Sequence, residues 1–477
     1  MKLKTLTGAC LFALGASPAM ALDPATTGAV GTTKIYVSGA SAPLATFTQL
    51  VGTMCSTTAD QYTVTGNSNI RGVSCTVKPG VSALAGKNVF VSYNADGGSG
   101  NGVYPIAKLV DSGGAFTADN AAQRPQIIDP AACTGVSPNF VCTSTQTGPR
   151  WSDAGASDVE PAMFAFDLNK PADFAATTLE AFELSNLNAA GAFQIVFGIA
   201  ATNNLYSDLA AAQGLSTGAG QVPSISRTAV SSLLAGFLSE PAAGLGWQAL
   251  FTPGTLPAGS AVTGPVNIGR RVNGSGTQTA ANAYFLDYGC APTANLAPAD
   301  TSANVPGKFI VNEGSGTSNV ITFLNGRNTA GEYAIGLVSK ENRPAVGSGW
   351  QHVAIDGVVA SRDNAKVGKY DYLYEFSMQW NTPYLDNFRT AQYPLPAGVT
   401  VADLKSFLQV FRVRAGSPTV LQGLSSAAQD GTTTAVNEGE GYIFNDSAVT
   451  PEGIANKKFV SRMTRNGNSC QKPLWLQ

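Results

Sequence analysis

The sequence has three glycine-rich turns that carry hydroxyl side chains. Each turn lies between a strand-like run and a helix-like run. They lie at residues 38–43, 97–102 and 274–277. Glycine lets a bound oxyanion approach the backbone, and the first N–H groups of a helix have no partner within the helix. The helix dipole adds partial positive charge at the same point. Each turn could therefore bind an anion such as phosphate.

Ser and Thr in front of a helix are also common helix caps, and capping alone would explain any single turn. Arg271 precedes the third turn and adds a guanidinium, which can neutralise an oxyanion through a fork of N–H groups. A hydrogen bond to a charged group contributes about 1.5–3 kcal/mol. Several such bonds would outweigh the desolvation of one anion if the turns converge, and the sequence alone does not show convergence.

The chain has one histidine, His352, at the start of a strand-like run. Any Ser-His-Asp or Cys-His mechanism would have to use it, and a structural or surface histidine is the simpler interpretation. An HExxH helix and two-histidine metal sites are excluded, and no CxxC pair is present. We therefore expect no metal, no cofactor and no histidine-based enzyme activity.

Six of the seven cysteines follow residue 21, an even number that suits disulfide bonds in an oxidising compartment. Many pairings are possible, and closeness in the sequence is only a preference. That preference predicts the pairs Cys55–Cys75 and Cys133–Cys142, which leaves Cys290 to pair with Cys470.

The elements that position the turns alternate between strand and helix. Strand-like runs lie at 34–37, 88–93, 192–199, 266–271 and 333–338, and helix-like runs at 44–50, 103–110, 227–238 and 278–286. This alternation predicts an α/β fold with mostly parallel sheets. Residues 111–150, with two cysteines, are expected to be a disulfide-stapled insertion, and residues 423–434 an exposed loop.

Composition narrows the class of protein. With 477 residues, 44% hydrophobic and 13% charged, the chain is neither disordered nor a disulfide mini-protein, and its length suggests two or three domains. Without the first 21 residues the charge is 27 Lys+Arg against 31 Asp+Glu, a net −4. This balance argues against a nucleic-acid partner.

The N-terminus has the pattern of a secretory signal peptide. Lys2 and Lys4 precede an apolar run at 6–14 and a small-residue site at 19–21, so we expect cleavage near Ala21 and a periplasmic or secreted protein. Cys10 as a lipidation site is the alternative, but the apolar stretch before it is short. No later run reaches the roughly 18 apolar residues of a membrane span.

The order of the motifs resembles periplasmic phosphate-binding proteins of the PstS type along most of the chain. The most specific motif is Arg-Arg-x-x-Gly-Ser-Gly-Thr at 270–277, and the others are the turns at 39–43 and 93–102, Gly-Ala-Ser-Asp at 155–158, and 331–338. The resemblance implies a type II periplasmic-binding-protein fold, in which two crossing strands join two lobes around the anion. It implies lobe I at 22–195 plus 380–477, including the insertion, and lobe II at 196–379.

The family's phosphate contacts, carried over by motif, fall on Ser41, Ala42, Ser99, Asp158, Arg271, Ser275, Gly276 and Thr277. A buried carboxylate can only accept a hydrogen bond, so Asp158 would favour an anion that still carries a proton, as phosphate does and sulfate does not. The alternative is that Asp158 caps a helix beginning near 160–163. The resemblance also implies a monomer that delivers phosphate or a related oxyanion to an ABC transporter membrane complex.

The chain departs from the family in three ways. Ser41-Ala42 stands where the family usually has Thr-Phe, the interval from Ser99 to Asp158 is long, and so is the whole chain. Two other functions therefore stay open. One is a secreted phosphatase-like hydrolase in which Asp158 or a site serine assists without a histidine, and the other is a surface or adhesion protein built on the same lobes.

Overall fold

The computed structural model describes residues 22–475 in part. The ranges 57, 118–124, 144–146, 217–219, 239–245, 252–254, 292–308, 418–419, 421–424, 427–433, 436–441, 446–459 and 462 are outside the description. The expected signal segment 1–21, with its cleavage site, and most of the expected loop at 423–434 therefore lie outside the described residues.

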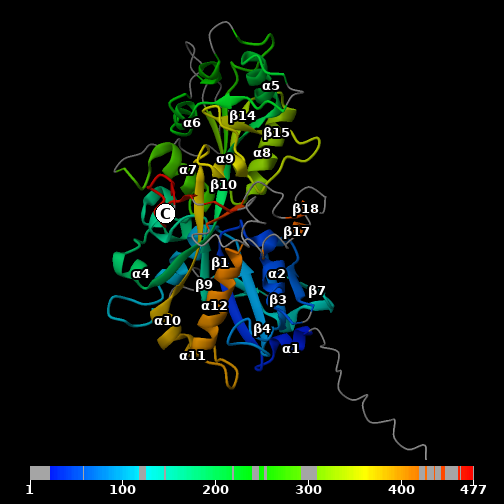
Figure 1. Cartoon of the computed structure of the whole chain (residues 1–477), viewed down its shortest axis with the longest axis vertical. Helices are drawn as coiled ribbons and strands as arrows, with labels where there is room; N and C mark the ends of the chain where they lie inside the picture. The colour runs from blue at the N-terminus through cyan, green and yellow to red at the C-terminus, as the bar shows by residue number, and fades with distance from the viewer. Residues whose placement is uncertain are drawn as a thin grey trace, which may run out of the picture.

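One mixed sheet runs through the whole molecule (Figure 1). In the lower half of Figure 1, β1 (Thr33–Gly39) lies between β4 (Asn88–Asn94) and β9 (Ala154–Ser157) and is parallel to both. α2 (Leu44–Gly52) follows β1 after the first turn. The other elements of this half are α1 (Pro24–Gly28), β2 (Asp60–Val64), β3 (Asn67–Thr76), η1 (Ser99–Gly102), α3 (Tyr104–Ala107), β5 (Gln126–Ile128), β6 (Thr134–Val136), β7 (Asn139–Cys142), β8 (Thr147–Pro149), η5 (Pro161–Ala165), α4 (Ala181–Ser185), α10 (Thr382–Asn387), α11 (Arg389–Gln392) and α12 (Val401–Ala415).

The upper half has the same plan. β12 (Val266–Arg271) lies between β13 (Phe309–Gly314) and β14 (Ala334–Ser339) and is parallel to both. α7 (Gly276–Leu286) follows β12 after the third turn. The other elements of this half are α5 (Asn203–Ala212), β11 (Ser224–Ile225), α6 (Arg227–Leu234), η9 (Gly246–Leu250), α8 (Thr317–Thr329), β15 (Trp350–Ile355) and α9 (Arg362–Lys366).

Two long strands join the halves. β10 (Leu187–Thr202) pairs antiparallel with β16 (Leu373–Asn381) along its first part and with β14 and β15 along its last part. Figure 1 shows β10 and β16 running between the two halves. The expectation of an α/β fold with two lobes and two crossing strands is confirmed, with parallel pairing at the centre of each lobe and antiparallel pairing at the crossing. The residue boundaries of the lobes stay a prediction.

The expected insertion at 111–150 extends the main sheet. β7 pairs parallel with β2 and antiparallel with β6, and β5 and β8 form a separate two-stranded ladder. The insertion therefore lies at the edge of the lower half, away from the crossing strands.

All three expected disulfides are present. Two of them join neighbouring cysteines and close short loops within the lower half, and the third, the pair that remained, joins positions 180 residues apart. The pairs are Cys55–Cys75, Cys133–Cys142 and Cys290–Cys470.

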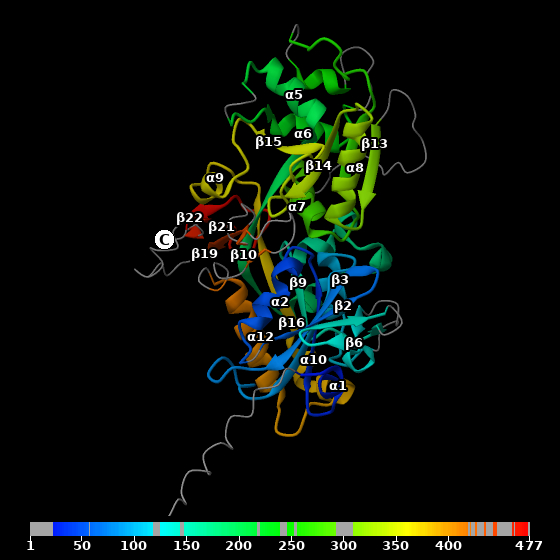
Figure 2. The ribbon, with the colours of Figure 1, turned by 90° about the vertical axis from the view of Figure 1, so that its right-hand side faces the viewer.

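The C-terminal strap, residues 463–475, lies against the crossing strands and contains β21 (Met463–Thr464) and β22 (Leu474–Trp475). Figure 2 shows these two strands beside α9 and β10. Glu375 of β16 accepts a hydrogen bond from the Gly467 backbone N–H at 2.8 Å, and Glu160 accepts one from the Ser469 N–H at 2.7 Å. The disulfide through Cys470 then fastens the strap to the end of α7.

The buried core continues from one half into the other. Phe47 of α2 contacts Tyr93 of β4 at 5.0 Å and Phe411 of α12 at 6.2 Å between ring centroids. Phe193 of β10 stacks on Phe376 of β16 at 4.4 Å, so the crossing strands share the same core. None of the described helices combines the length and apolar character that crossing a membrane requires.

Candidate functional site

Asp158 follows β9 and is 3% exposed. Its backbone N–H donates to the Ser99 hydroxyl at 3.1 Å, and its carboxylate oxygen Oδ1 is buried with no hydrogen-bond partner among the described residues. Burial raises the pKa of Asp158 to about 6, against the opposing effects of the Arg271 charge and the Ser99 hydroxyl. Asp158 thus offers a desolvated acceptor that a donor would stabilise.

The N-terminus of α7 lies directly against Asp158 and Ser99. A Cβ atom added to Gly276 would lie 2.3 Å from Ser99 Oγ and 2.8 Å from Asp158 Oδ2. Real Cβ contacts are not this short, so the close approach of the helix requires glycine at this position. The structure therefore brings residues from both lobes, predicted separately, into one place.

Ser275 is the N-cap residue of α7, but its side chain makes no cap hydrogen bond within the described part of the chain. Ordinary capping therefore does not explain the third turn. Ser275 and Thr277 are 2% and 4% exposed, and they flank the first backbone N–H groups of the helix. Both side chains carry a hydroxyl that can donate a hydrogen bond, and both lie at the helix N-terminus where an oxyanion would bind.

The second turn, in the lower half, and the third turn, in the upper half, are in direct contact. The Gly100 N–H donates to the Gly274 carbonyl oxygen at 2.7 Å, and a Cβ on Gly98 would lie 3.2 Å from the Cα of Ser275. Gly98 and Gly274 have positive φ angles of 71° and 89°, which glycine adopts without strain. Ser99 is held between them and buried.

Arg271 is the last residue of β12 and is 2% exposed. Its guanidinium donates through Nε to Gly314 O at 3.2 Å, through Nη1 to Thr317 Oγ1 at 3.1 Å and through Nη2 to Ser315 O at 2.8 Å. Burial lowers its pKa to about 10, with the charges of Asp158 and Glu341 opposing the shift, so Arg271 is a cation at neutral pH. It thus supplies a fixed positive charge to Asp158 while it anchors the turn between β13 and α8.

The neighbouring Arg270 has a different role. It forms an ion pair with Glu313 of β13, with Nη2 and Oε1 2.7 Å apart. Because successive side chains of a strand point to opposite faces, only Arg271 acts on Asp158.

Ser41 and Ala42 belong to the first turn. β1 and β9 are parallel with Gly39 opposite Ala156, so Ser41 and Asp158 leave the sheet at the same edge. Ser41 is half-buried, and its carbonyl oxygen accepts a hydrogen bond from the Leu44 N–H at 3.1 Å as α2 begins. Their role as ligands stays a prediction.

The alternative role of Asp158 as a helix cap is wrong. The short 3-10 helix η5 begins at Pro161, its N-cap residue is Glu160, and the Glu160 carboxylate binds Ser469 of the C-terminal strap. Asp158 is therefore not a helix cap, and its side chain lies beside Ser99 and the N-terminus of α7.

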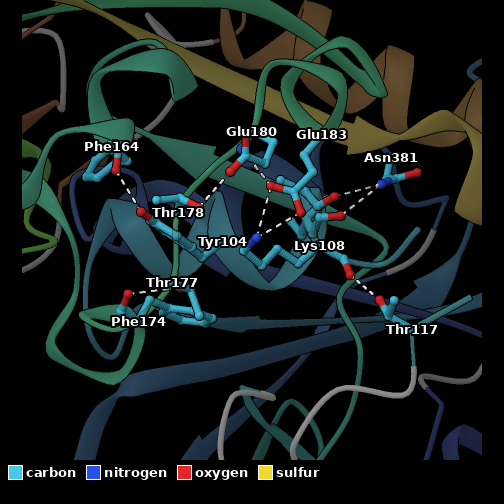
Figure 3. A network of polar contacts seen from close by, with 12 residues as sticks. Tyr104, Lys108, Thr117, Phe164, Phe174, Thr177, Thr178, Glu180, Glu183 and Asn381 are labelled. Atoms are coloured by element: carbon cyan, nitrogen blue, oxygen red, sulfur yellow. Dashed lines mark hydrogen bonds and ion pairs between the residues drawn. The ribbon is translucent and has the colours of Figure 1, made fainter. Parts of the chain in front are cut away.

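A polar network holds the segment that follows the second turn (Figure 3). Lys108, just after α3, forms an ion pair with Glu183 of α4 at 2.8 Å, and Tyr104 donates to the Phe164 carbonyl oxygen at 2.9 Å. Asn381, at the end of β16, donates to the Ile106 carbonyl oxygen at 3.0 Å. The expected helix at 103–110 is only one turn long, because side-chain donors take carbonyl oxygens that a longer helix would use.

Sequence reasoning did not find Glu341. This residue follows β14, and the Ser339 hydroxyl donates to its Oε1 at 2.6 Å. Its Oε2 is buried and has no partner in the described ranges. Burial raises the pKa of Glu341 to about 7, the Ser339 hydrogen bond lowers it, and the charges of Asp158 and Arg271 act in opposite directions. A charged residue in a Lys-Glu-Asn sequence after a strand suggests an exposed turn, so only the strand order reveals its position.

His352 has a structural environment. It lies on β15, its Nε2 is 3.3 Å from the Asn342 carbonyl oxygen, and burial, its largest influence, holds its pKa well below the usual range. A Cβ on Gly198 of β10 would lie 2.8 Å from His352 Nδ1, so the ring packs closely on the crossing strand. The described residues contain no cluster of three His, Cys, Asp or Glu side chains able to hold a metal ion.

Comparison with known proteins gives matches among solved structures only. No family model and no curated protein matches the chain. A protein from Clostridium perfringens, named as a phosphate ABC transporter substrate-binding protein and solved with bound phosphate, is 14% identical over 82% of this chain and 95% of its own, with a TM-score of 0.41. All matches described here are named for phosphate binding or transport.

Two further matches have similar values. A phosphate-binding protein from Stenotrophomonas maltophilia is 14% identical over 81% of this chain and 95% of its own, with a TM-score of 0.37. An ABC-type phosphate transport receptor from Vibrio cholerae is 11% identical over 79% and 94%, with a TM-score of 0.35.

Proposed function

We propose that this chain is an exported solute-binding protein that binds inorganic phosphate, or a similar tetrahedral oxyanion, between its two lobes. The observation that carries the proposal is the buried Asp158 carboxylate, which lies against the N-terminus of α7 under the influence of the Arg271 charge and whose Oδ1 has no partner among the described residues. A buried acceptor and a cluster of donors occur together there, and a protonated oxyanion satisfies both.

The donors suit an anion in type and charge. Phosphate oxygens in proteins are bound by the N–H groups at helix N-termini, by hydroxyls and by guanidinium groups. The candidate site offers the first N–H groups of α7, the hydroxyls of Ser99, Ser275 and Thr277, and the guanidinium of Arg271. Asp158 would accept the hydrogen bond of a P–OH group. Sulfate has no such hydrogen at neutral pH, so the same carboxylate would repel it.

The wider role follows from the same proposal. We propose delivery to an ABC transporter, a lobe I formed by 22–195 and 380–477, and a lobe II formed by 196–379. The site holds acceptors and donors suited to binding, and the one histidine lies in a structural environment on β15. We therefore propose binding without hydrolysis.

Equilibrium dialysis of the exported, purified protein against radiolabelled phosphate tests the proposal. We expect saturable binding that excess unlabelled phosphate abolishes and excess sulfate does not. Incubation with a chromogenic phosphomonoester should release no product beyond the rate without protein. Absence of saturable phosphate binding by folded protein would refute the proposed ligand, and turnover would favour a hydrolase.

A further inference from the structure

Glu341 enters the candidate site through the order of the strands. β12 and β14 are parallel neighbours with Gly269 opposite Gly336, so Arg271 and Ser339 come to the same edge of the sheet. The chain turns immediately after Ser339 and places Glu341 close enough for its charge to act on both Arg271 and Asp158. Two carboxylates, one from each half of the molecule, thus share one cation.

The two oxygens of Glu341 differ in their surroundings. Oε1 is fixed by the Ser339 hydroxyl at 2.6 Å, whereas Oε2 is buried and lacks a partner in the described part of the chain. The three guanidinium hydrogen bonds of Arg271 go to Gly314, Ser315 and Thr317. Glu341 is therefore held in place by its own turn, with one oxygen left as a buried acceptor, which is costly unless a donor reaches it.

We propose that Glu341 is a second acceptor for the bound oxyanion and that, with Asp158, it makes the site select dihydrogen phosphate, the singly charged form with two hydroxyl groups. This inference rests on the proposed phosphate binding and specifies the form of the ligand. Each P–OH group donates to one carboxylate, and the other two oxygens receive the α7 N–H groups, the hydroxyls and the Arg271 guanidinium.

The charges explain the selection. With both carboxylates ionised, hydrogen phosphate dianion can satisfy only one of them, and the other repels it at short range. The charged or titratable groups that act on Glu341 are Asp158, just after β9, and Arg271 of β12. Lys340 and His352 are near in the fold, and His352 is neutral because its pKa is well below the usual range. Burial raises the pKa of Glu341 to about 7, so both carboxylates are ionised above that pH, and affinity for total phosphate is expected to fall as the pH rises further and the singly charged form becomes scarce.

Titration calorimetry of phosphate binding at pH 7, 8 and 9 tests the inference with the parent protein, Glu341→Gln and Glu332→Gln. Glu332 precedes β14 at the opposite end of the strand and pairs with Arg327 at 2.9 Å, so its substitution removes the same charge away from the site. Between pH 8 and pH 9 we expect affinity to fall about tenfold in the parent, because the singly charged form becomes about ten times scarcer, and to change less than about twofold in Glu341→Gln. Glu332→Gln should keep the parent's profile.

A Glu341→Gln protein that folds, binds phosphate and keeps the parent's pH profile would overturn the inference while leaving phosphate binding intact. A folded parent that binds no phosphate would instead refute the proposed function.

A second measurement needs no variant. At pH 8, binding in two buffers of different ionisation enthalpy should show uptake of about one proton per phosphate, because the dianion is protonated as it binds. Uptake near zero would also overturn the inference.

Discussion

Asp158→Asn gives the sharpest test of the site, because it changes charge and hydrogen bonding with almost no change in shape. The carboxylate is 3% exposed and Oδ1 lacks a partner among the described residues, so the substitution replaces an ionic acceptor that only a ligand can satisfy. Loss of one hydrogen bond to a charged group, about 1.5–3 kcal/mol, should weaken phosphate binding roughly 10- to 150-fold. The amide can donate to an unprotonated oxygen, so affinity for sulfate should rise.

The same substitution should stabilise the protein without ligand. The pKa of Asp158 is raised from 3.8 to about 6, so the ionised carboxylate is disfavoured in the folded state. This contribution to stability is fully present below pH 3.8 and is lost as the pH rises through about 6. The difference of about 2 pH units corresponds to roughly 3 kcal/mol at neutral pH. Asn cannot ionise, so the gain should appear at pH 7 and vanish near pH 4.

Calorimetric titration with phosphate and with sulfate measures the first effect, and thermal unfolding at pH 4 and pH 7 measures the second. Asp167→Asn is the matched control, because Asp167 is 86% exposed and pairs only with Lys170 of the same turn in the described contacts. Equal phosphate affinity and equal exclusion of sulfate in Asp158→Asn and the parent would remove Asp158 from the site.

Three further predictions concern the groups around Asp158. Arg271→Ala should weaken phosphate binding more than about 100-fold by calorimetry, since at least two charge-assisted hydrogen bonds are lost, whereas Arg270→Ala should leave it unchanged; equal effects would place the site elsewhere. Gly276→Ala should weaken phosphate binding at least tenfold in the same assay, because the new methyl group would lie 2.3 Å from Ser99 Oγ, and unchanged affinity would contradict the close approach of α7. The double variant Cys290→Ser, Cys470→Ser should lose about 2–4 kcal/mol of unfolding free energy, measured by denaturant titration, and an unchanged midpoint would show that the strap is held without the disulfide.

Local patterns in the sequence predicted those parts of the fold that depend on neighbouring residues. The strand at 266–271, the glycine turn after it and the helix that follows are present, because hydrophobic periodicity and glycine positions act over a few residues. The disulfides of nearby cysteines were predictable for a similar reason. The helix at 103–110 was predicted too long, because Asn381, more than 270 residues away in the sequence, takes the Ile106 carbonyl oxygen.

The candidate site was likewise predictable where local motifs define it and unpredictable where it depends on the order of the strands. The motifs indicated Ser99, Asp158, Arg271 and Gly276, and the structure brings Ser99, Asp158 and Gly276 into contact, with Arg271 acting on Asp158 through its charge. Glu341 could not be predicted, because its place depends on β12 and β14 being neighbours in the sheet although β13 lies between them in the chain. A resemblance based on motifs identifies residues that the motifs contain, and Glu341 lies just beyond the last of them.

The C-terminal strap links a distant part of the chain to the arrangement of the site. Glu160 lies two residues after Asp158, and its carboxylate is held by Ser469, near the end of the sequence. The segment beside Asp158 is thus held by a residue 309 positions away in the sequence, and the Cys290–Cys470 disulfide fastens that part of the strap. We therefore expect a protein cleaved just before the strap at residue 463 to bind phosphate weakly even though every residue of the candidate site is present.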